Sequence, residues 1–465
     1  MLQTKLVDLL GEIADLDIET RPAELEAHAY DALGAGRAAS APDAVTPAVV
    51  ARPRTTGAVS ALLRLAQETR TPVTVQGGAT GLMGAARSLH DGIVLDMAAM
   101  AGVREIDAEA QAVWAEAGAT IAQVNASLER HGLFVAHDPW TVSIATVGGT
   151  ISTNGLGFLG GKYGSMGQQV LGVEAVLADG TVFQTPAVRP RSSGPDLTSL
   201  VIACEGQFAV ITAAALRAFP LPEARLLAGF RFRSFAAGFG ALLTMRRAGL
   251  TPAILDFGDR YPSSGGTGAD ATLYLGFDGC REEAEAAMGR ARSACTGAGG
   301  TAVGDDEVTA FWDSRHEIAE GFARRRAAGE RARGSAGGRS FDYVHVSLPA
   351  SRVLTYRARA LAIAQAAGVT VAETGLWATP ELFSLVLAAD AGPADDAVQR
   401  TAAVVDECLR LAQSSGGSME YCHGAGVRLA HLMRAEHGAG LDVMRRMKQA
   451  LDPAGVLNPG KLSLS

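Results

Sequence analysis

The sequence predicts a fold of the α+β class, divided into two or three domains. Its 465 residues exceed what one compact hydrophobic core usually holds. Short apolar runs alternate with stretches in which apolar residues recur at helical spacing. A proline-containing stretch at 220–225 separates two such regions, and it is therefore expected to be a domain boundary.

The first part of the chain is expected to mix helices and strands. Residues 1–40 are expected to be helical, because the opening MLQTKLVDLLGEIADLDIET has an amphipathic pattern. From residue 45 onward the pattern is that of β–α–β units. The expected strands are VTPAVVARP, PVTVQGG, GIVLDM and AVWAEAGAT, and the expected helices are TGAVSALLRLAQET and IAQVNASLERHG.

The middle and last parts are expected to form a hairpin, a second domain and two closing helices. VLGVEAVLADGTVFQT predicts two strands joined at Asp179-Gly180, a pair typical of tight turns. Beyond the boundary, the strands LLAGFRFRS, ATLYLGFDG and FDYVHVSLP alternate with helices at 239–248, 281–297 and 310–330. Segments 298–306 and 324–339 are expected to be loops, and 396–451 is expected to hold two helices around SSGGSMEYCHGAGVRL.

Composition excludes several functional classes. The net charge of −8 argues against a nucleic-acid binder, which is normally basic. Five scattered cysteines without a C-x-x-C pair indicate reduced thiols in a cytoplasmic protein. The acidic residues of the opening stretch are unlike a signal peptide, and no run of about 18 uncharged apolar residues is long enough for a transmembrane helix.

Two glycine stretches suggest a nucleotide cofactor. Gly155–Gly160 spells G-x-G-x-x-G, but TVGGTIST before it is a poor strand and no helix is expected after it, so a Rossmann site is not favoured. A Walker loop is excluded because Tyr163 follows Lys162. The alternative is a pair of loops, at 77–81 and 148–149, whose backbone N–H groups hold a diphosphate cofactor from both sides. Ordinary turns remain the plain interpretation of either loop alone.

Several ordered motifs carry a resemblance to a known family. They are PVTVQGGATGL, HDPWTVSIATVGGTISTNGLG, VLGVEAVLADGTV, ACEGQFAVITAAALR and ALDPAGVLNPGKL. Together they resemble the FAD-binding flavoproteins of the vanillyl-alcohol oxidase / p-cresol methylhydroxylase (PCMH) type, over about 45–220 and 400–462 and more weakly at 311–352. The branch is that of D-lactate and glycolate dehydrogenases and alkyldihydroxyacetonephosphate synthase, and PRSSGPD at 190–196 most resembles the synthase.

The resemblance implies a two-subdomain PCMH-type FAD-binding domain plus an α+β cap, the FAD-linked oxidase C-terminal domain. The expected boundaries are a helical segment at 1–44, the FAD-binding domain at 45–222, the cap at 223–405 and C-terminal helices at 406–465 that return to the FAD site. FAD is expected to be non-covalent, because QGGATG lacks the His that relatives with covalent flavin carry in this loop.

The resemblance also implies a set of FAD-binding residues. The loop at 77–81 would hold the diphosphate, the stretches at 139–141, 148–149, 153–154 and 206–211 would line the ribityl and flavin portions, and the closing NPGK would reach toward the isoalloxazine. The residues expected to bind FAD are Gly77, Gly78, Ala79, Thr80, Gly81, Leu82, Pro139, Thr141, Gly148, Gly149, Thr153, Asn154, Tyr163, Gly164, Glu205, Gly206, Val210, Ile211, Asn458 and Lys461.

Two stretches depart from the family pattern. The usual E-G-T-L-G-V-I-T reads Glu205-Gly-Gln207-Phe208-Ala209, and these bulkier groups are expected to reshape the wall beside the cofactor or to tilt the flavin. The related hydroxyacid dehydrogenases carry a His-rich motif before the last helices, where this chain has Glu373–Pro380 without any His. No metal site is therefore expected.

Four residues are candidates for catalysis. His423 lies where the dehydrogenases show E-H-G and the synthase shows a His triplet, and it is the expected base; the alternative is a structural His in a loop. Arg315, in a W-x-x-R sequence, is expected to anchor an anion, or else to form a surface ion pair. Tyr343 and His345 lie two residues apart on a strand, so both are expected to face the flavin. Tyr421, the fourth candidate, lies two residues before His423. Cys422 is expected to be buried and inert.

These residues favour an FAD-dependent oxidoreductase that oxidises a small hydroxylated, anionic substrate by hydride transfer to flavin N5. One alternative is transfer like that of the synthase, through a covalent adduct at flavin N5, although Tyr421 and Cys422 break the His triplet. Another is a non-catalytic flavin-binding subunit of a dehydrogenase complex. The expected partners are a small-molecule substrate and an electron acceptor (oxygen, quinone or another protein), with a possible homodimer.

Overall fold

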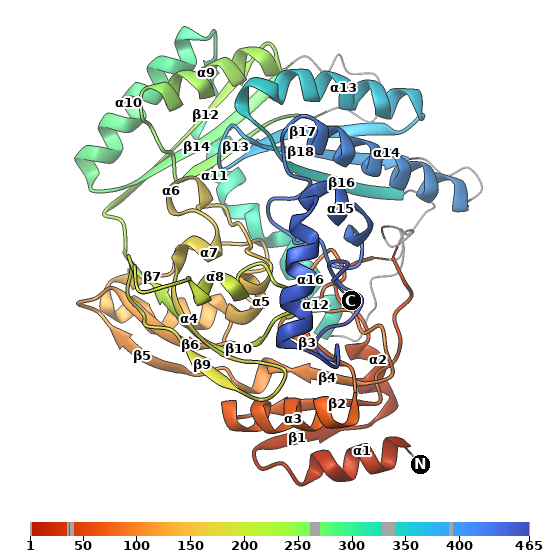
Figure 1. Ribbon diagram of the computed structural model, residues 1–465. Helices are drawn as coiled ribbons and strands as arrows, with labels where there is room; N and C mark the ends of the chain where they lie inside the picture. The colour runs from red at the N-terminus through yellow and green to blue at the C-terminus, as the bar shows by residue number, and fades with distance from the viewer. Residues whose placement is uncertain are drawn as a thin grey trace.

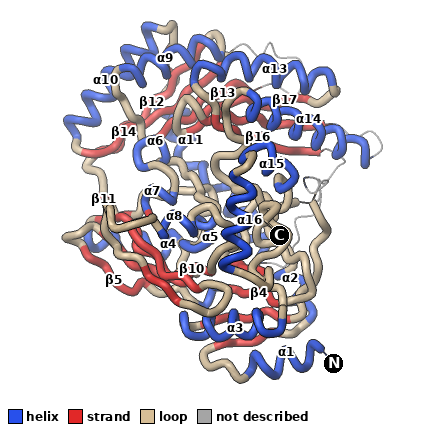
Figure 2. Tube along the Cα trace, in the orientation of Figure 1, coloured by secondary structure: helices blue, strands red, loops and turns tan. Residues whose placement is uncertain are grey.

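The computed structural model describes residues 2–34, 37, 41–260, 270–327, 340–389 and 394–464. Figure 1 shows two smaller sheets in an N-terminal half, with a large sheet and its helices above them. Figure 2 shows many loops between these two layers of strands. We call the large sheet and its helices, residues 224–414, the cap.

The first sheet of the N-terminal half has the order β1-β2-β4-β3. The strands β2, β4 and β3 are parallel, and α3 (Thr56–Thr69) connects β2 to β3; the Thr55 side chain caps its start by accepting from the Ala58 N–H. The strand bounds are β1 (Leu16–Glu19), β2 (Val49–Pro53), β3 (Val73–Gln76) and β4 (Ile93–Asp96).

One expectation for the N-terminus was wrong. Residues 1–40 are not helical throughout, because β1 lies between α1 (Leu2–Gly11) and α2 (Pro22–His28). β1 pairs antiparallel with β2, with Leu16 opposite Pro53. The reason is tertiary: a four-residue strand carries little periodic signal of its own, and its backbone groups are satisfied by the edge of β2.

The second sheet of the N-terminal half has the order β5-β6-β10-β8-β9. The β8–β9 hairpin turns at Asp179-Gly180 as expected, with Val176 opposite Val182 and Gly180 at φ +83°. The glycine-rich stretch after β7 forms the short helices α5 and α6, and the expectation that no helix follows Gly160 was wrong, because α6 begins at that residue. The bounds are β5 (Val103–Asp107), β6 (Ala112–Glu116), α4 (Ile121–Leu128), β7 (Leu133–Phe134), α5 (Val147–Ser152), α6 (Gly160–Tyr163), α7 (Met166–Gln169), β8 (Val170–Val176), β9 (Val182–Gln184), α8 (Leu197–Val201), β10 (Val210–Arg217) and β11 (Phe219–Pro220).

The cap is a seven-stranded antiparallel sheet of order β15-β12-β14-β13-β17-β18-β16. Helices α9, α10, α13 and α14 contact these strands and cover the face away from the N-terminal half (Figure 1). The bounds are β12 (Ala224–Phe232), α9 (Phe235–Arg247), β13 (Ile254–Arg260), β14 (Ala271–Gly279), α10 (Arg281–Gly297), β15 (Thr301–Ala302), α11 (Asp305–Asp313), α12 (Glu317–Ala327), β16 (Ser340–Ser347), α13 (Val353–Ala366), β17 (Thr370–Trp377), β18 (Leu382–Ala389) and α14 (Ala394–Ser414). The segment 298–306, expected to be a loop, holds β15 and the start of α11. Of the second expected loop, 324–339, residues 324–327 belong to α12, and residues 328–339 lie outside the described residues.

The register of the cap sheet places a row of residues toward the N-terminal half. His345 pairs with Ser384 across β16 and β18, and Ser384 pairs with Gly375 across β18 and β17. Tyr343, two residues along β16 from His345, shares its face of the sheet. The small Ser384 and Gly375 leave space in front of the sheet beside the two rings.

The C-terminal segment ties the two regions together. After α15 (Met433–His437), α16 (Gly440–Leu451) lies beside the N-terminal half near β3 (Figure 1). Buried Lys448 donates to the carbonyls of Gln207 and Leu457, and the Asn458 N–H donates to the Val73 carbonyl at 2.7 Å. The strand β3 and the end of the chain are therefore held as one unit. No described helix has the length and apolarity needed to cross a membrane.

Candidate functional site

A cavity of about 500 Å³ lies between the N-terminal half and the inner face of the cap sheet. Residues of both regions line it, from the two glycine loops on one side to β16, β17 and β18 on the other. Its volume lies in the usual range for ligand sites, and domain interfaces are a common place for such sites.

The two glycine loops touch each other at the cavity wall. A Cβ atom on Gly77 would lie 2.3 Å from Thr146 Oγ1, and one on Gly78 would lie 2.1 Å from the Ile144 carbonyl oxygen. Glycine permits this approach, because a Cβ atom would collide with the Thr146 side chain at Gly77 and with the Ile144 backbone at Gly78. The Thr146 side chain also accepts from the Gly149 N–H at 3.3 Å, which starts α5. Two loops nearly 70 residues apart in sequence therefore form one wall.

Most of the residues expected to bind cofactor lie on this wall. From the expected set, the cavity lining contains Gly77, Gly78, Ala79, Thr80, Gly81, Leu82, Pro139, Thr141, Gly148, Gly149, Thr153, Glu205, Gly206, Val210, Ile211 and Asn458. The expected catalytic residues His345, Tyr421 and His423 line the same cavity, as does Tyr343. The alternation on β16 thus places both Tyr343 and His345 on the cavity side.

Four expected cofactor residues lie outside the lining. Asn154 accepts from the Gly167 N–H at 2.9 Å, and Tyr163, followed by Gly164, donates to Asp278 at 3.1 Å. Lys461 is fully buried and donates to the Arg87 carbonyl at 2.6 Å. Burial lowers the pKa of Lys461 to about 8, although Asp31 and Glu205 oppose the shift. These residues support the walls from behind.

Arg315 is also absent from the lining. Its Nε donates to Asp138 at 3.0 Å, its Nη1 donates to the Trp312 carbonyl, and its guanidinium lies 3.8 Å from the centre of the Trp312 ring. His316 contributes a second contact to the same carboxylate, at 3.0 Å. The expectation that Arg315 faces the substrate is therefore corrected: its charge is used within the protein, where it joins α11 to the N-terminal half.

The departures at Gln207 and Phe208 do not reshape the cavity wall, contrary to expectation. Gln207 is fully buried, and its side chain donates to the Asn458 carbonyl at 2.5 Å. Phe208 packs in the main hydrophobic core, and only Ala209 of the three substituted residues lines the cavity. The bulkier side chains of Gln207 and Phe208 therefore do not line the cavity.

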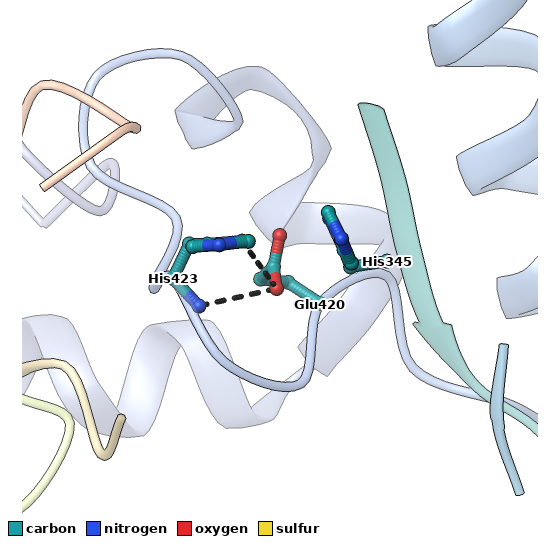
Figure 3. Close-up of side chains that lie close together, drawn as sticks. All are labelled: His345, Glu420 and His423. Carbon is teal, nitrogen blue, oxygen red and sulfur yellow. Dashed lines mark hydrogen bonds and ion pairs between the residues drawn. The ribbon is translucent and has the colours of Figure 1, made fainter. Parts of the chain in front are cut away.

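The segment Glu420–Gly424, here called the histidine loop, is organised by one carboxylate. Glu420 Oε1 accepts from the backbone N–H groups of Tyr421, Cys422 and His423 at 2.9, 2.9 and 3.2 Å. The same oxygen lies 3.4 Å from His423 Nδ1, and Figure 3 shows the contacts of Glu420 with His423. Burial opposes charge on Glu420, but His423 and the hydrogen bonds prevail and hold its pKa at about 2. Cys422 was expected to be buried, but it is partly exposed and lines the cavity. Desolvation raises the pKa of its thiol well above the usual value, so the thiol stays protonated.

His345 completes a cluster of three donors. Its ring centre lies 4.6 Å from that of His423 and 5.4 Å from that of Tyr421, and its Nδ1 has no partner. Burial, and then the charge of His423, lower the pKa of His345 to about 3, so His345 is neutral at physiological pH. Donor atoms of His345, Glu420 and His423 lie within 4.8 Å of one another, and imidazole and carboxylate ligands of this kind suit a divalent transition metal. The expectation of no metal site considered only Glu373–Pro380, whereas these three donors come from two other segments.

Some lining residues were missed as functional candidates. His137 is fully buried, both its ring nitrogens lack partners, and burial lowers its pKa to about 4. Asn458, which was among the residues expected to bind FAD, has a second such atom on the wall: its Oδ1 has no hydrogen-bond partner. Such orphaned atoms are rare in folded proteins, and a polar ligand would satisfy them. His137 is the first residue of the motif HDPWTVSIATVGGTISTNGLG, and this position was its only signal in the sequence.

Comparison with known proteins identifies both regions. Residues 47–186 match the model of an FAD binding domain, and residues 221–462 match that of the C-terminal domain of FAD linked oxidases. Glycolate oxidase subunit GlcD of Bacillus subtilis is 27% identical over 93% of this chain and 93% of its own length. D-lactate dehydrogenase of Archaeoglobus fulgidus is 29% identical over 91% of this chain and 93% of its own length.

A solved structure shares the fold. Alkyldihydroxyacetonephosphate synthase matches 98% of this chain and 85% of its own chain with a TM-score of 0.78, at 16% sequence identity. The likeness confirms the expected PCMH-type fold with its cap domain. The segment 190–196, which resembles the synthase in sequence, lies outside the cavity lining, where Asp196 pairs with Arg189 and Arg191.

Proposed function

We propose, from the premise that this chain belongs to the family of FAD-linked oxidases, that it oxidises a small hydroxylated acid with a non-covalently bound FAD. The observation that carries the proposal is the shared cavity: the glycine loops of the FAD-binding domain and the histidine loop line the same space. The curated relatives named above are a glycolate oxidase subunit and a D-lactate dehydrogenase, and the names of both refer to hydroxy acids.

The cavity walls fit FAD. The glycine-rich loop at 77–82 and residues 148–149 both line the cavity, and the backbone N–H groups of such loops suit a diphosphate. His137 and Asn458 offer unpartnered polar atoms for the rest of the cofactor. The loop at 77–82 contains no His, Cys or Tyr that could attach to a flavin, which supports non-covalent binding. When bound, FAD supplies at its N5 position the acceptor for the hydride that leaves the substrate carbon.

His423 is the proposed base. The negative Glu420 beside Nδ1 favours the tautomer with a proton on that nitrogen, so Nε2, which lies 3.5 Å from the Cys422 sulfur, is the nitrogen that accepts the proton of the substrate hydroxyl. As the proton leaves the oxygen, the hydride leaves the carbon, and a carbonyl product remains. Glu420 also fixes the loop that carries His423, so the ring has one orientation in the cavity. The neutral His345 packs against it without competing for the proton.

An anaerobic substrate screen tests the proposal. The yellow protein is mixed with a panel of 2-hydroxy acids and uncharged alcohols without oxygen, and loss of the flavin absorbance is followed. We expect at least one hydroxy acid to bleach the flavin, and acid precipitation to release all FAD into the supernatant. Failure of every hydroxy acid to bleach a stoichiometrically loaded protein would refute the oxidation, and flavin that stays in the precipitate would refute non-covalent binding.

A further inference from the structure

Arg37 lies at the cavity although no sequence pattern marked it. It precedes both segments that match the family models. Its Nε donates to Asp342 Oδ1 at 3.0 Å, and its guanidinium lies 4.8 Å from the centre of the Tyr343 ring. Asp342 and Tyr343 are neighbours on β16, so a residue from before the FAD-binding domain reaches the inner face of the cap.

The environment of Arg37 leaves an excess of positive charge. Asp342 also pairs with Arg428, so two guanidinium groups share one buried carboxylate. Arg428 Nε donates to the Arg37 carbonyl at 2.9 Å, which fixes the Arg37 backbone. Burial, and then the charge of Arg37, lower the pKa of Arg428 against the effect of Asp342. One positive charge therefore remains uncompensated within this trio.

The guanidinium of Arg37 retains an unused donor. Its side chain is only 10% exposed, and Nη2 is buried without any hydrogen-bond partner. Among the described residues that line the cavity, Arg37 is the only arginine or lysine. Glu373 also lines the cavity and acts electrostatically on Tyr343; the backbones of Glu373 and Tyr343 pair through Val386 and are about 10 Å apart, two strand spacings. A buried, unpaired guanidinium donor is costly unless a ligand completes it.

We propose that Arg37 binds the anionic group of the substrate, the role expected of Arg315. Its planar fork still presents donors for a carboxylate oxygen while Nε is held by Asp342. The rings of Tyr343, His345 and His423 continue from Arg37 along the cavity, with centres 5.8 and 4.6 Å apart. The anion at Arg37 thereby positions the rest of the substrate toward His423. This assignment rests on the proposed function, because it concerns the same cavity.

Anion binding by the flavin-loaded protein tests the assignment without turnover. Oxalate is titrated into the oxidised protein, and the flavin spectrum and the fluorescence of Trp140 and Trp377, which both line the cavity, are recorded. We expect Arg37→Gln to raise the Kd of oxalate about 10- to 100-fold, as for loss of a hydrogen bond to a charged group. Arg37→Lys keeps the charge but loses the fork, and it should weaken oxalate at least threefold.

Arg104→Gln is the matched control. Arg104 is a partly exposed arginine that pairs with Glu116 and Glu174, and it does not line the cavity, so its loss should leave the Kd unchanged. Oxalate affinities equal to that of the parent in both Arg37 variants would overturn the assignment, and so would equal loss in Arg104→Gln. If no hydroxy acid bleaches the flavin yet oxalate binding depends on Arg37, the proposed reaction fails while the anion site stands. If hydroxy acids bleach parent and Arg37→Gln with equal KM, the reaction stands and the anion site fails.

Discussion

The two walls of the cavity are built in different ways. The wall of the N-terminal half is rich in backbone: Gly77 and Gly78 allow two loops to touch where a Cβ would collide with Thr146 or Ile144. The wall of the cap consists of side chains on a sheet face, with His345, Ser384 and Gly375 in one row. A backbone wall suits a cofactor shared by a whole family, whereas a side-chain wall can change with the substrate.

Each wall also satisfies its charges differently. In the N-terminal half, buried Glu205 accepts from the N–H groups of Ala425 and Gly426 at 2.7 and 2.9 Å. In the histidine loop, Glu420 accepts three N–H groups and faces His423. Burial raises the pKa of the first carboxylate despite its two hydrogen bonds and the charge of Lys461, whereas His423 and the hydrogen bonds of the second outweigh burial and lower its pKa.

Replacing His423 should have the largest effect on the chemistry. His423→Asn keeps a polar side chain but has no proton-accepting ring nitrogen, so the anaerobic rate of flavin bleaching should fall about 10²- to 10⁴-fold. FAD content should stay at one per chain, because His423 belongs to the cap side of the cavity. Arg104→Gln, at a residue outside the cavity lining, is the control and should change the rate less than threefold. An unchanged rate in His423→Asn removes it from the mechanism.

Filling the backbone wall should instead remove the cofactor. In Gly78→Ala the new methyl group would meet the Ile144 carbonyl, and separating the loops should cost about 1–3 kcal/mol. We expect FAD to bind at least tenfold more weakly, as measured by fluorescence titration of the flavin-free protein. Gly289→Ala on α10, where no atom lies within 4 Å, is the control and should bind FAD normally. Normal FAD affinity in Gly78→Ala would contradict a cofactor held between the loops.

The buried Glu205 should make stability depend on pH. Burial raises its pKa from 4.5 to about 7, so between these values the folded protein holds a proton that the unfolded chain has lost. The associated stability is complete below about pH 4.5 and is lost as pH rises through 7, by up to about 3 kcal/mol. Compared with Glu205→Gln in urea unfolding of the flavin-free protein, the parent should lose more stability between pH 5 and pH 7.5. Parallel pH profiles would show that Glu205 is charged throughout.

Removing metal should have the smallest effect. If His423 acts as a base held by Glu420, dialysis against EDTA should leave the rate of flavin bleaching within twofold. The cluster of His345, Glu420 and His423 nevertheless has suitable donors for Zn²⁺. A loss of activity that Zn²⁺ or Mn²⁺ restores would assign the cluster to a metal and exclude His423 as the free base.

The comparison of the two walls also explains what the sequence could predict. The glycine loops and the helix α10, expected at 281–297 and found at Arg281–Gly297, depend on local pattern and were predicted well. The inner row of β16 followed from simple alternation. β1 was missed because four residues carry too little pattern without the partner strand β2.

Long-range contacts account for the failures. Arg315 pairs with Asp138, a carboxylate 177 positions away in the sequence. The W-x-x-R motif alone does not reveal this contact. Arg37 is isolated in sequence and acquires meaning only through Asp342, 305 positions on. Gln207 contacts the Asn458 carbonyl, 251 positions away, and Phe208 packs in the main hydrophobic core, and neither contact can be seen in the local sequence.

Hydrogen exchange on addition of FAD tests most directly whether the two walls form one site. Flavin-free protein is compared with FAD-loaded protein by mass spectrometry, with peptides from α10 on the outer face as the unaffected reference. We predict slower amide exchange in 73–82 and 144–154 and also in the histidine loop at 419–426, since all three line or adjoin the cavity. Protection confined to the first two segments would contradict the account, because it would place the histidine loop away from the cofactor.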